Sequence, residues 1–174
     1  MFEMEQFNTE RMVMLVENEK QLMRSVQLLR SFWNVQKNIM RFVQKTAAEN
    51  GLTVHQYSIL MTITLYKETS QKNVGEKTFL PKSTLSQAVD GLVRGGLLHR
   101  EPVEGNRREI KLSITDKGEN LLKTIHFHEG SIHQVFQTAI GMLSEEQFEE
   151  LLKTHLQITN FLEAQATEQG ECTK

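Results

Sequence analysis

The middle of the chain changes its apolar period abruptly, from that of a helix to that of a strand. Between residues 82 and 94 apolar side chains recur three and four positions apart, which is the spacing of one helical face. They are Leu85, Ala88, Val89, Leu92 and Val93. Gly95-Gly96 ends this pattern, a short strand-like run follows at 97–101, and residues 109–114 alternate polar and apolar side chains. The sequence therefore predicts a helix followed at once by a β-hairpin.

Two further helices are predicted immediately before that helix. Thr53 and Gln56 form the pattern of a capping box, in which the two residues satisfy the first backbone N–H groups of a helix. Ser70 can cap a short helix that extends to about Thr78, and Pro81 suits the first turn of the next one. Helix, short helix, helix and hairpin in this order are the plan of a winged helix-turn-helix.

Long helices with broad apolar faces are predicted on both sides of this core. Residues from about 8 to 49 carry two neighbouring apolar stripes, which Asn50-Gly51 ends. Thr115 can cap a helix that reaches about residue 140, and a last helix follows from about residue 144. The first of these faces is too wide to be buried on one small domain. We therefore expect it to pair with the same region of a second chain.

Charge is distributed unevenly along the chain. The whole sequence has a net charge of −2, from 20 basic and 22 acidic residues. Residues 77–117 contain eight basic and five acidic residues and carry +3, which leaves −5 for the rest. A basic module between acidic flanks fits a nucleic-acid-binding protein, although ordinary fluctuation in charge also explains an excess of this size.

The expected compartment is the cytoplasm. The one cysteine, Cys172, cannot form a disulfide within the chain, which fits a reducing environment. The first residues lack the pattern of a signal peptide, and no apolar run is long enough to span a membrane.

The outward face of the helix over 82–94 has the composition of a surface that reads DNA. Its side chains are small, polar or amide-bearing: Lys82, Ser83, Thr84, Ser86, Gln87 and Asp90. Small residues let a helix sit deep in the major groove, and a glutamine can read adenine through two hydrogen bonds. The other interpretation is a solvated face, which usually carries more Lys and Glu.

Two adjacent arginines, Arg107 and Arg108, lie at the turn of the predicted hairpin. An arginine on a projecting hairpin can enter a narrow minor groove, where the electrostatic potential is strongly negative. Without the helix upstream, the two arginines would be interpreted as ordinary surface charges. The helix directly upstream makes DNA contact the better interpretation.

Residues 69–121 resemble the winged-helix core of the MarR (multiple antibiotic resistance regulator) family. The resemblance rests on Val74-Gly75-Glu76, the run from Lys82 to Asp90, Leu92, Gly96-Leu97-Leu98, Asn106-Arg107-Arg108 and the run from Leu112 to Gly118. It implies an obligate homodimer whose first and last two helices interlock, bound to a palindromic operator. It also implies a repressor that a ligand or an oxidant releases from the DNA.

The sequence departs from the family pattern at the wing and at the turn between the two motif helices. Asn106 stands where the family often has an aspartate that orients the wing arginine, which leaves open whether Arg107 or Arg108 enters the groove. Phe79 replaces a residue that is usually Gly-like, and Thr78 a residue that is usually apolar. An unusual turn geometry is expected there.

The expected fold is therefore mainly α with a small β-hairpin wing: a winged helix-turn-helix core with long N- and C-terminal dimerisation helices. We expect an N-terminal dimerisation region at 1–50, a DNA-binding lobe at 51–118, C-terminal dimerisation helices at 119–166 and a disordered tail at 167–174.

The resemblance also predicts the kind of effector. The resemblance implies small anions or phenolic compounds, held in a crevice between the dimer helices and the DNA-binding lobe. Trp33, Phe42, His55 and Tyr57 are candidates to line it, and simple core packing is the stronger interpretation of the same residues.

Metal and redox sensing are weaker alternatives. His126, Glu129 and His133 would share one face of a continuous helix, with the two histidines about 10 Å apart along the axis. That is too far for one ion without other ligands, so we predict no metal and no cofactor. Cys172 lies in a polar tail, whereas a sensor thiol is usually held near a group that lowers its pKa.

The sequence also bears on two other function classes. The sequence has no phosphate-binding loop, no metalloprotease signature and no G-x-S-x-G motif, so we do not expect an enzyme. A winged helix that binds protein is the remaining alternative. The polar helix face and the wing arginines favour DNA over it.

Overall fold

The computed structural model describes the backbone of residues 2–103 and 106–171, and the side chains of residue 14 and of residues 16–103 and 109–168. The chain divides into two compact units, Met1–Glu119 and Asn120–Lys174, which are described separately below.

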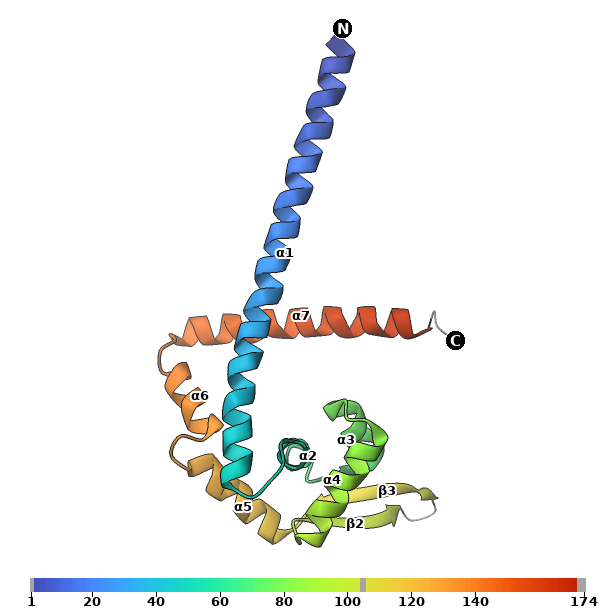
Figure 1. The fold of residues 1–174 in the computed structure, drawn as a ribbon, viewed down its shortest axis with the longest axis vertical. Coiled ribbons are helices and arrows are strands. Elements are labelled where there is room, and N and C mark those ends of the chain that lie inside the picture. Colours follow the sequence, from blue (N-terminus) through green and yellow to red (C-terminus); the bar gives the residue numbers. More distant parts are fainter. Residues whose placement is uncertain (1, 104–105, 172–174) are drawn as a thin grey trace. The chain divides into compact units, whose positions relative to one another are not determined.

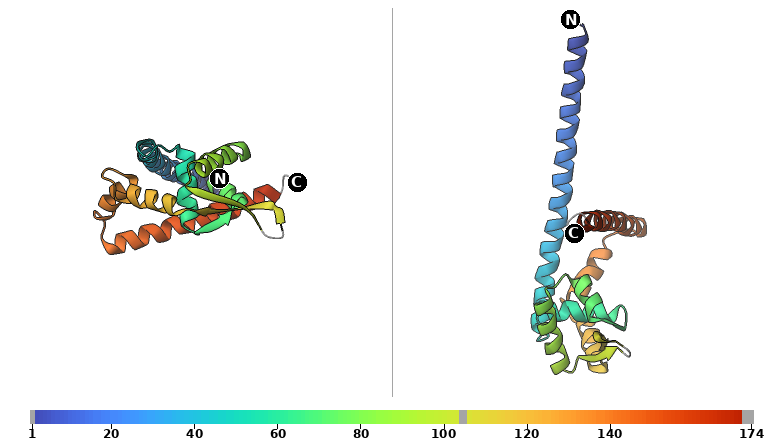
Figure 2. Two further views of the ribbon diagram at one scale, coloured as in Figure 1. Left: turned by 90° about the horizontal axis from the view of Figure 1, so that it is seen from below. Right: turned by 90° about the vertical axis from the view of Figure 1, so that its right-hand side faces the viewer.

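The first unit begins with one long helix, α1 (Phe2–Glu49), which is unbroken in Figure 1 and Figure 2. It starts earlier than the predicted residue 8. It ends as predicted, because Gly51 adopts a φ of 66° and the Leu52 N–H donates to the Ala47 carbonyl at 2.9 Å. Thr46 and Ala47 in its last turn are buried, whereas the apolar stripes further up the helix are exposed.

Three helices form the helical part of the lobe: α2 (Val54–Thr64), α3 (Gln71–Thr78) and α4 (Lys82–Arg94). The predicted capping box is confirmed, since Gln56 N–H donates to Thr53 Oγ1 at 3.2 Å and Thr53 N–H donates to Gln56 Oε1 at 2.9 Å. The predicted cap of α3 is also confirmed, because Asn73 N–H donates to Ser70 Oγ at 3.1 Å. Gly96, with a φ of 69°, follows the end of α4.

The sheet has three antiparallel strands in the order β1-β3-β2, drawn in Figure 1: β1 (Glu68–Ser70), β2 (Leu98–Val103) and β3 (Asn106–Ile114). The predicted hairpin of β2 and β3 is confirmed, and β1 adds a third strand that the sequence did not predict. Thr69 on β1 pairs with Leu112 on β3. Between the same two strands, Lys111 Nζ lies 3.3 Å from Glu68 Oε2. A strand of three residues is too short to have a detectable period, so only pairing with β3 defines it.

The core of the lobe lies between the three helices and the sheet. Its most fully buried side chains come from α2, α3, α4 and the strands: Ile59, Leu60, Ile63, Val74, Val89, Leu92, Leu98 and Leu112. Leu85 and Ala88 are buried beside them, so the predicted inward face of α4 is confirmed. That burial leaves the opposite side of α4 free for another partner.

Three helices complete the chain: α5 (Asp116–Phe127), α6 (Ile132–Ile140) and α7 (Glu145–Glu171). Thr115 caps α5 as predicted, accepting from Gly118 N–H at 3.0 Å. The prediction of one helix up to residue 140 was wrong. Gly130 has a φ of 74°, and Ser131 starts a new helix by accepting from Gln134 N–H at 3.3 Å.

The backbone of α7 stays helical to Glu171, whereas the sequence predicted a disordered tail from about residue 167. Cys172 lies outside the described residues. No helix in the described part of the chain combines the length and the apolar character needed to cross a membrane.

Candidate nucleic-acid interface

The polar face of α4 points away from the core. Lys82, Ser83, Gln87 and Asp90 are exposed or partly exposed, and Thr84 and Ser86 also reach the surface. The six residues that the sequence analysis singled out on this helix therefore all reach the surface of the lobe. Their order places the positive charge of Lys82 at the N-terminal end of the helix and the amide of Gln87 in its middle.

The N-terminus of α4 is also suited to anions. Pro81 is the N-cap and, in the described structure, makes no side-chain hydrogen bond to the helix. The first backbone N–H groups of α4 are thus not satisfied by a capping side chain, and they carry the positive end of the helix dipole. Together with Lys82 they form a surface that can accept a phosphate group.

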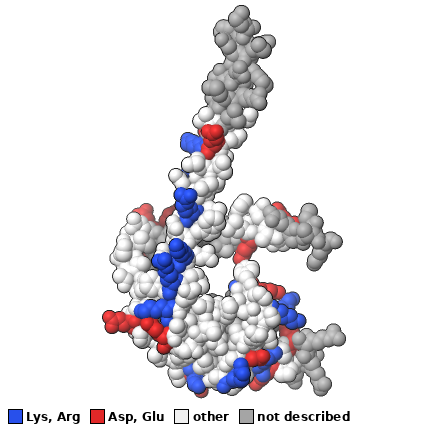
Figure 3. All heavy atoms as spheres, in the orientation of Figure 1, with Lys and Arg blue, Asp and Glu red and all other residues white. Residues whose placement is uncertain are grey.

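An open groove of about 870 Å³ lies between α3, the start of α4 and the two long strands. Its apolar floor contains Leu80, Leu85 and Ile110. Charged side chains of both signs line its sides: Lys72, Glu76, Lys82, Arg100 and Glu109. Figure 3 also shows Lys and Arg beside Asp and Glu on the lobe, so this face is mixed in charge rather than uniformly basic.

An ion pair connects α4 to the wing. Arg100 Nη1 on β2 donates to Asp90 Oδ1 on α4 at 2.6 Å, and the two side chains are 33% and 50% exposed. The pair ties the orientation of β2 to that of α4. Asp90, which was predicted to face DNA, also has this partner within the lobe. Arg100 was missed as its partner, because no local pattern links two residues ten positions apart across a Gly-Gly turn.

Arg107 and Arg108 belong to β3, but their side chains lie outside the described residues. The structure does describe the pairing of β3, the strand to which both arginines belong. β3 pairs with β2 on one side and with β1 on the other, so it is the central strand of the sheet. The assignment of these arginines to the minor groove remains a prediction.

The four residues proposed to line an effector site are not gathered in one enclosed place within this chain. Trp33 is 61% exposed on α1, and Phe42 and His55 also reach the surface. Tyr57 is buried, and burial raises the pKa of its hydroxyl above the usual value. Trp33 and Phe42 are nine residues apart on one helix, about 14 Å along its axis, and neither lines the groove described above.

His126 and His133 lie much closer together than the sequence predicted. The break between α5 and α6 brings their ring centroids to 4.0 Å in an edge-to-face arrangement with an interplanar angle of 61°. Burial, and secondly the charge of His126, lower the pKa of His133. The structure shows no cluster of three His, Cys, Asp or Glu residues placed to hold a metal ion within the described part of the chain.

Comparisons with known proteins agree with this fold. The model of the MarR family matches residues 50–109. The HTH-type transcriptional regulator YkoM of Bacillus subtilis is 27% identical over 139 residues, which are 78% of this chain and 87% of YkoM.

Two solved structures share the fold. One is a mutant of MarR from E. coli in complex with operator DNA, with a TM-score of 0.61 and 17% identity over 74% of this chain and 91% of that chain. The other is NadR in complex with 4-hydroxyphenylacetate, with a TM-score of 0.64 and 16% identity over 74% and 89% of the two chains. Residues 50–109 thus match the MarR family, and the chain has the winged-helix fold of these DNA-binding transcriptional regulators.

Proposed function

We propose that this regulator is a cytoplasmic homodimeric repressor, which binds a palindromic operator and is released from it by a small-molecule effector. The observation that supports DNA binding is the exposed polar face of α4, which contacts the wing through the Asp90–Arg100 pair. A helix and a hairpin fixed to each other can enter adjacent grooves together.

Within this proposal the residues of α4 divide by chemistry. Lys82 and Ser83, at the N-terminus of the helix, contact phosphates. Thr84 and Ser86 allow close approach to the bases because they are small, and Gln87 reads a base edge. Arg107 and Arg108 supply the minor-groove contact. Asp90 acts indirectly, as a positioning residue for Arg100 and the wing.

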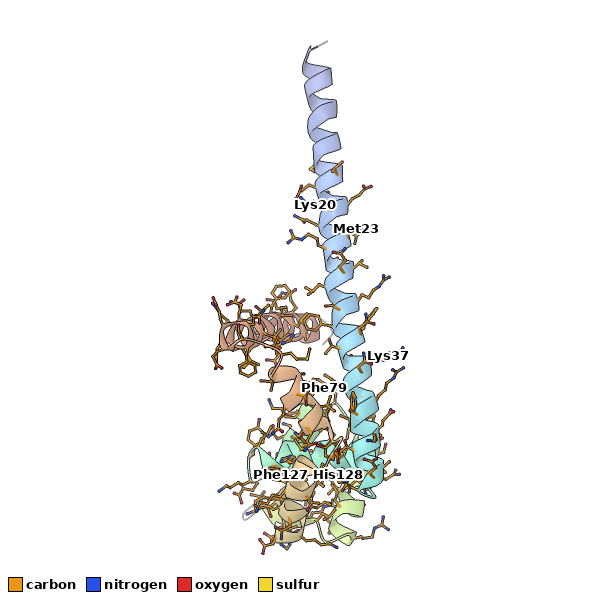
Figure 4. The ribbon with its side chains drawn as sticks, turned by 90° about the vertical axis from the view of Figure 1, so that its left-hand side faces the viewer. Lys20, Met23, Lys37, Phe79, Phe127 and His128 are labelled. Atoms are coloured by element: carbon orange, nitrogen blue, oxygen red, sulfur yellow. The ribbon has the colours of Figure 1, made fainter. Side chains whose placement is uncertain are left out.

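The dimer is supported by the apolar surface that one chain leaves uncovered. Figure 4 shows side chains projecting freely along α1, including Met23. Large exposed apolar residues are frequent on α1 and α7: Met14, Val16, Leu22, Met23, Val26, Leu28, Leu29, Trp33, Val35, Leu151, Leu152, Leu156, Phe161 and Leu162. Exposed apolar side chains in such numbers along a helix are typical of a protein–protein interface. A second copy is the natural partner, since most soluble oligomers are symmetric homo-oligomers.

The effector part of the proposal is supported by a solved structure of the same fold and by four residues of α1 and α2. NadR was solved with 4-hydroxyphenylacetate, a phenolic acid, and it shares the fold. In this chain Trp33, Phe42, His55 and Tyr57 offer two apolar rings and two groups that can hydrogen-bond. Because Trp33 is exposed in one chain, we propose that the second chain completes the pocket.

Selection of bound duplexes from a random pool tests the DNA-binding proposal. We expect an inverted repeat whose half-sites are about 10 base pairs apart, centre to centre, as for other dimeric helix-turn-helix proteins. Gln87→Ala should change the preferred base at one position of each half-site and leave the salt dependence of binding unchanged. Enrichment of no sequence, or of a single unpaired half-site, would contradict the proposal.

Sedimentation tests the dimer. The wild-type protein is expected to be a dimer at micromolar concentration. Leu29→Glu, on the apolar face of α1, should raise the dissociation constant by about tenfold or more, because it places a charge in the interface. The matched control is Gln27→Glu, which adds the same charge to the other side of the helix. A monomeric wild-type protein, or equal effects of the two substitutions, would count against this interface.

A further inference from the structure

We propose that Phe79, in the turn between α3 and α4, is a DNA-contacting residue that recognises thymine through its C5-methyl group. The inference rests on the proposed entry of α4 into the major groove. It adds a specificity-determining residue outside the helix itself, at a position where the sequence departs from the family pattern.

The backbone at Phe79 is unfavourable for a bulky residue. Phe79 is the C-cap of α3 and has a φ of 53° and a ψ of 24°, which is the left-handed helical region. In that region the Cβ atom approaches the carbonyl oxygen, so glycine or asparagine usually occupies such a position. An aromatic residue there is an outlier. Folding of the lobe alone would favour glycine.

The side chain of Phe79 gives no packing in return for this strain. It is 91% exposed, the highest value among the large apolar residues described. Its neighbour Leu80 instead contributes to the floor of the groove between α3, α4 and the strands. Phe79 therefore has two unfavourable features, a strained backbone conformation and a solvent-exposed aromatic ring. Packing within the described lobe offsets neither of them. Strain of this kind is concentrated at binding sites.

The position of Phe79 indicates which partner covers it. The turn that carries it, marked in Figure 4, leads directly into the end of α4 that presents Lys82 and Ser83. In a helix-turn-helix the N-terminal residues of the second helix approach the base edges, so the turn before them comes to the rim of the groove. A phenyl ring cannot hydrogen-bond there. The apolar group that the major groove presents is the thymine methyl.

Replacing thymine by deoxyuridine tests the assignment, because it removes only the methyl group. The probe is the duplex that the wild-type protein selects, with one thymine at a time replaced by deoxyuridine. We expect wild-type affinity to fall about fourfold at one position in each half-site, the value of one buried methyl group. Phe79→Gly should bind the unmodified duplex about tenfold more weakly and be insensitive to the same replacements.

Two further variants separate contact from folding. Phe79→Asn removes the ring but tolerates the left-handed backbone, so it should bind as Phe79→Gly does. The Tm of both variants should be no lower than that of the wild type. Leu65→Ala removes another exposed apolar side chain, at a residue with an ordinary φ of −64°, and should leave affinity unchanged.

The outcomes distinguish this inference from the function on which it rests. If the wild-type protein selects no duplex, the proposed function fails. If the wild type binds DNA and Phe79→Gly binds equally well, Phe79 does not contact DNA, and its exposed ring then belongs to an interface with protein. If Phe79→Gly binds more weakly but keeps the sensitivity to deoxyuridine, the contact is not with the thymine methyl. Either of these last two results overturns the inference.

Discussion

Replacing Arg107 and Arg108 together by alanine should weaken operator binding about a hundredfold at about 0.15 M salt. Each arginine is expected to make a charge-assisted hydrogen bond to DNA, worth about 1.5 kcal/mol, and two such bonds amount to about two orders of magnitude in affinity. If both contact phosphates, the slope of log affinity against log salt should also become shallower by about 2. Fluorescence anisotropy with the selected duplex, measured over a range of salt, gives both quantities.

Lys111→Ala is the matched control, because it removes one positive charge from the same strand away from the wing tip. Lys111 pairs with Glu68 on β1, at 3.3 Å. A half-exposed pair of this kind contributes little, so its loss should change affinity by less than about threefold. Thermal unfolding of each variant checks that the lobe is intact. An affinity of the double variant close to that of the wild type would exclude the wing from DNA binding.

Replacing Arg107 and Arg108 one at a time tests which of them enters the minor groove, the question that Asn106 leaves open. Replacing the arginine that enters the minor groove should change the sequence preference as well as the affinity. The other should mainly reduce the salt dependence, because a phosphate contact carries little sequence information.

Gly118→Ala is expected to destabilise the folded protein by about 2–3 kcal/mol, the cost of overpacking a site that cannot relax. A Cβ at Gly118 would collide with the backbone oxygen of Leu97 and lie 2.8 Å from Ile114 Cγ1. Leu97 cannot move away easily. Its N–H donates to the Leu92 carbonyl at 2.9 Å, and its oxygen accepts from Thr115 N–H at 3.2 Å.

The junction around Gly118 explains why this substitution should act on the whole lobe. Thr115 Oγ1 donates to the Gly96 carbonyl at 2.7 Å, and Lys117 Nζ donates to the Gly95 carbonyl at 2.8 Å. The start of α5 is thus bonded to the turn that ends α4. Displacing α5 by the width of a methyl group would break these contacts together, so the loss should be cooperative.

Gly141→Ala is the matched control for this prediction. Gly141 has an ordinary helical φ of −61°, and a Cβ there would lie 3.4 Å from the nearest carbonyl oxygen. Its substitution should leave the stability unchanged or slightly higher, because alanine reduces the freedom of the unfolded chain. Urea unfolding at one fixed protein concentration measures both variants. Equal stability of Gly118→Ala and the wild type would show that the junction can absorb the methyl group.

The sequence alone was sufficient where a structure depends on neighbours within one helical turn. The caps by Thr53, Ser70 and Thr115 join a side chain to a backbone group three residues away, so composition and spacing predict them. The inward face of α4 follows from its period for the same reason. The polar face opposite it, and hence the candidate DNA surface, was predicted correctly as a solvent-facing surface on this basis.

Only the tertiary structure decided the features that join distant residues. β1 exists because β3 offers an unpaired edge more than 40 residues later, and three residues carry no period of their own. Asp90 faces Arg100 because packing fixes the angle between α4 and β2, and His126 meets His133 because the chain turns at Gly130. For the surface of α4, then, the sequence determined which side chains are presented. The fold determined that Asp90 holds the wing beside them, since such a contact depends on the relative placement of two elements and leaves no pattern in either one.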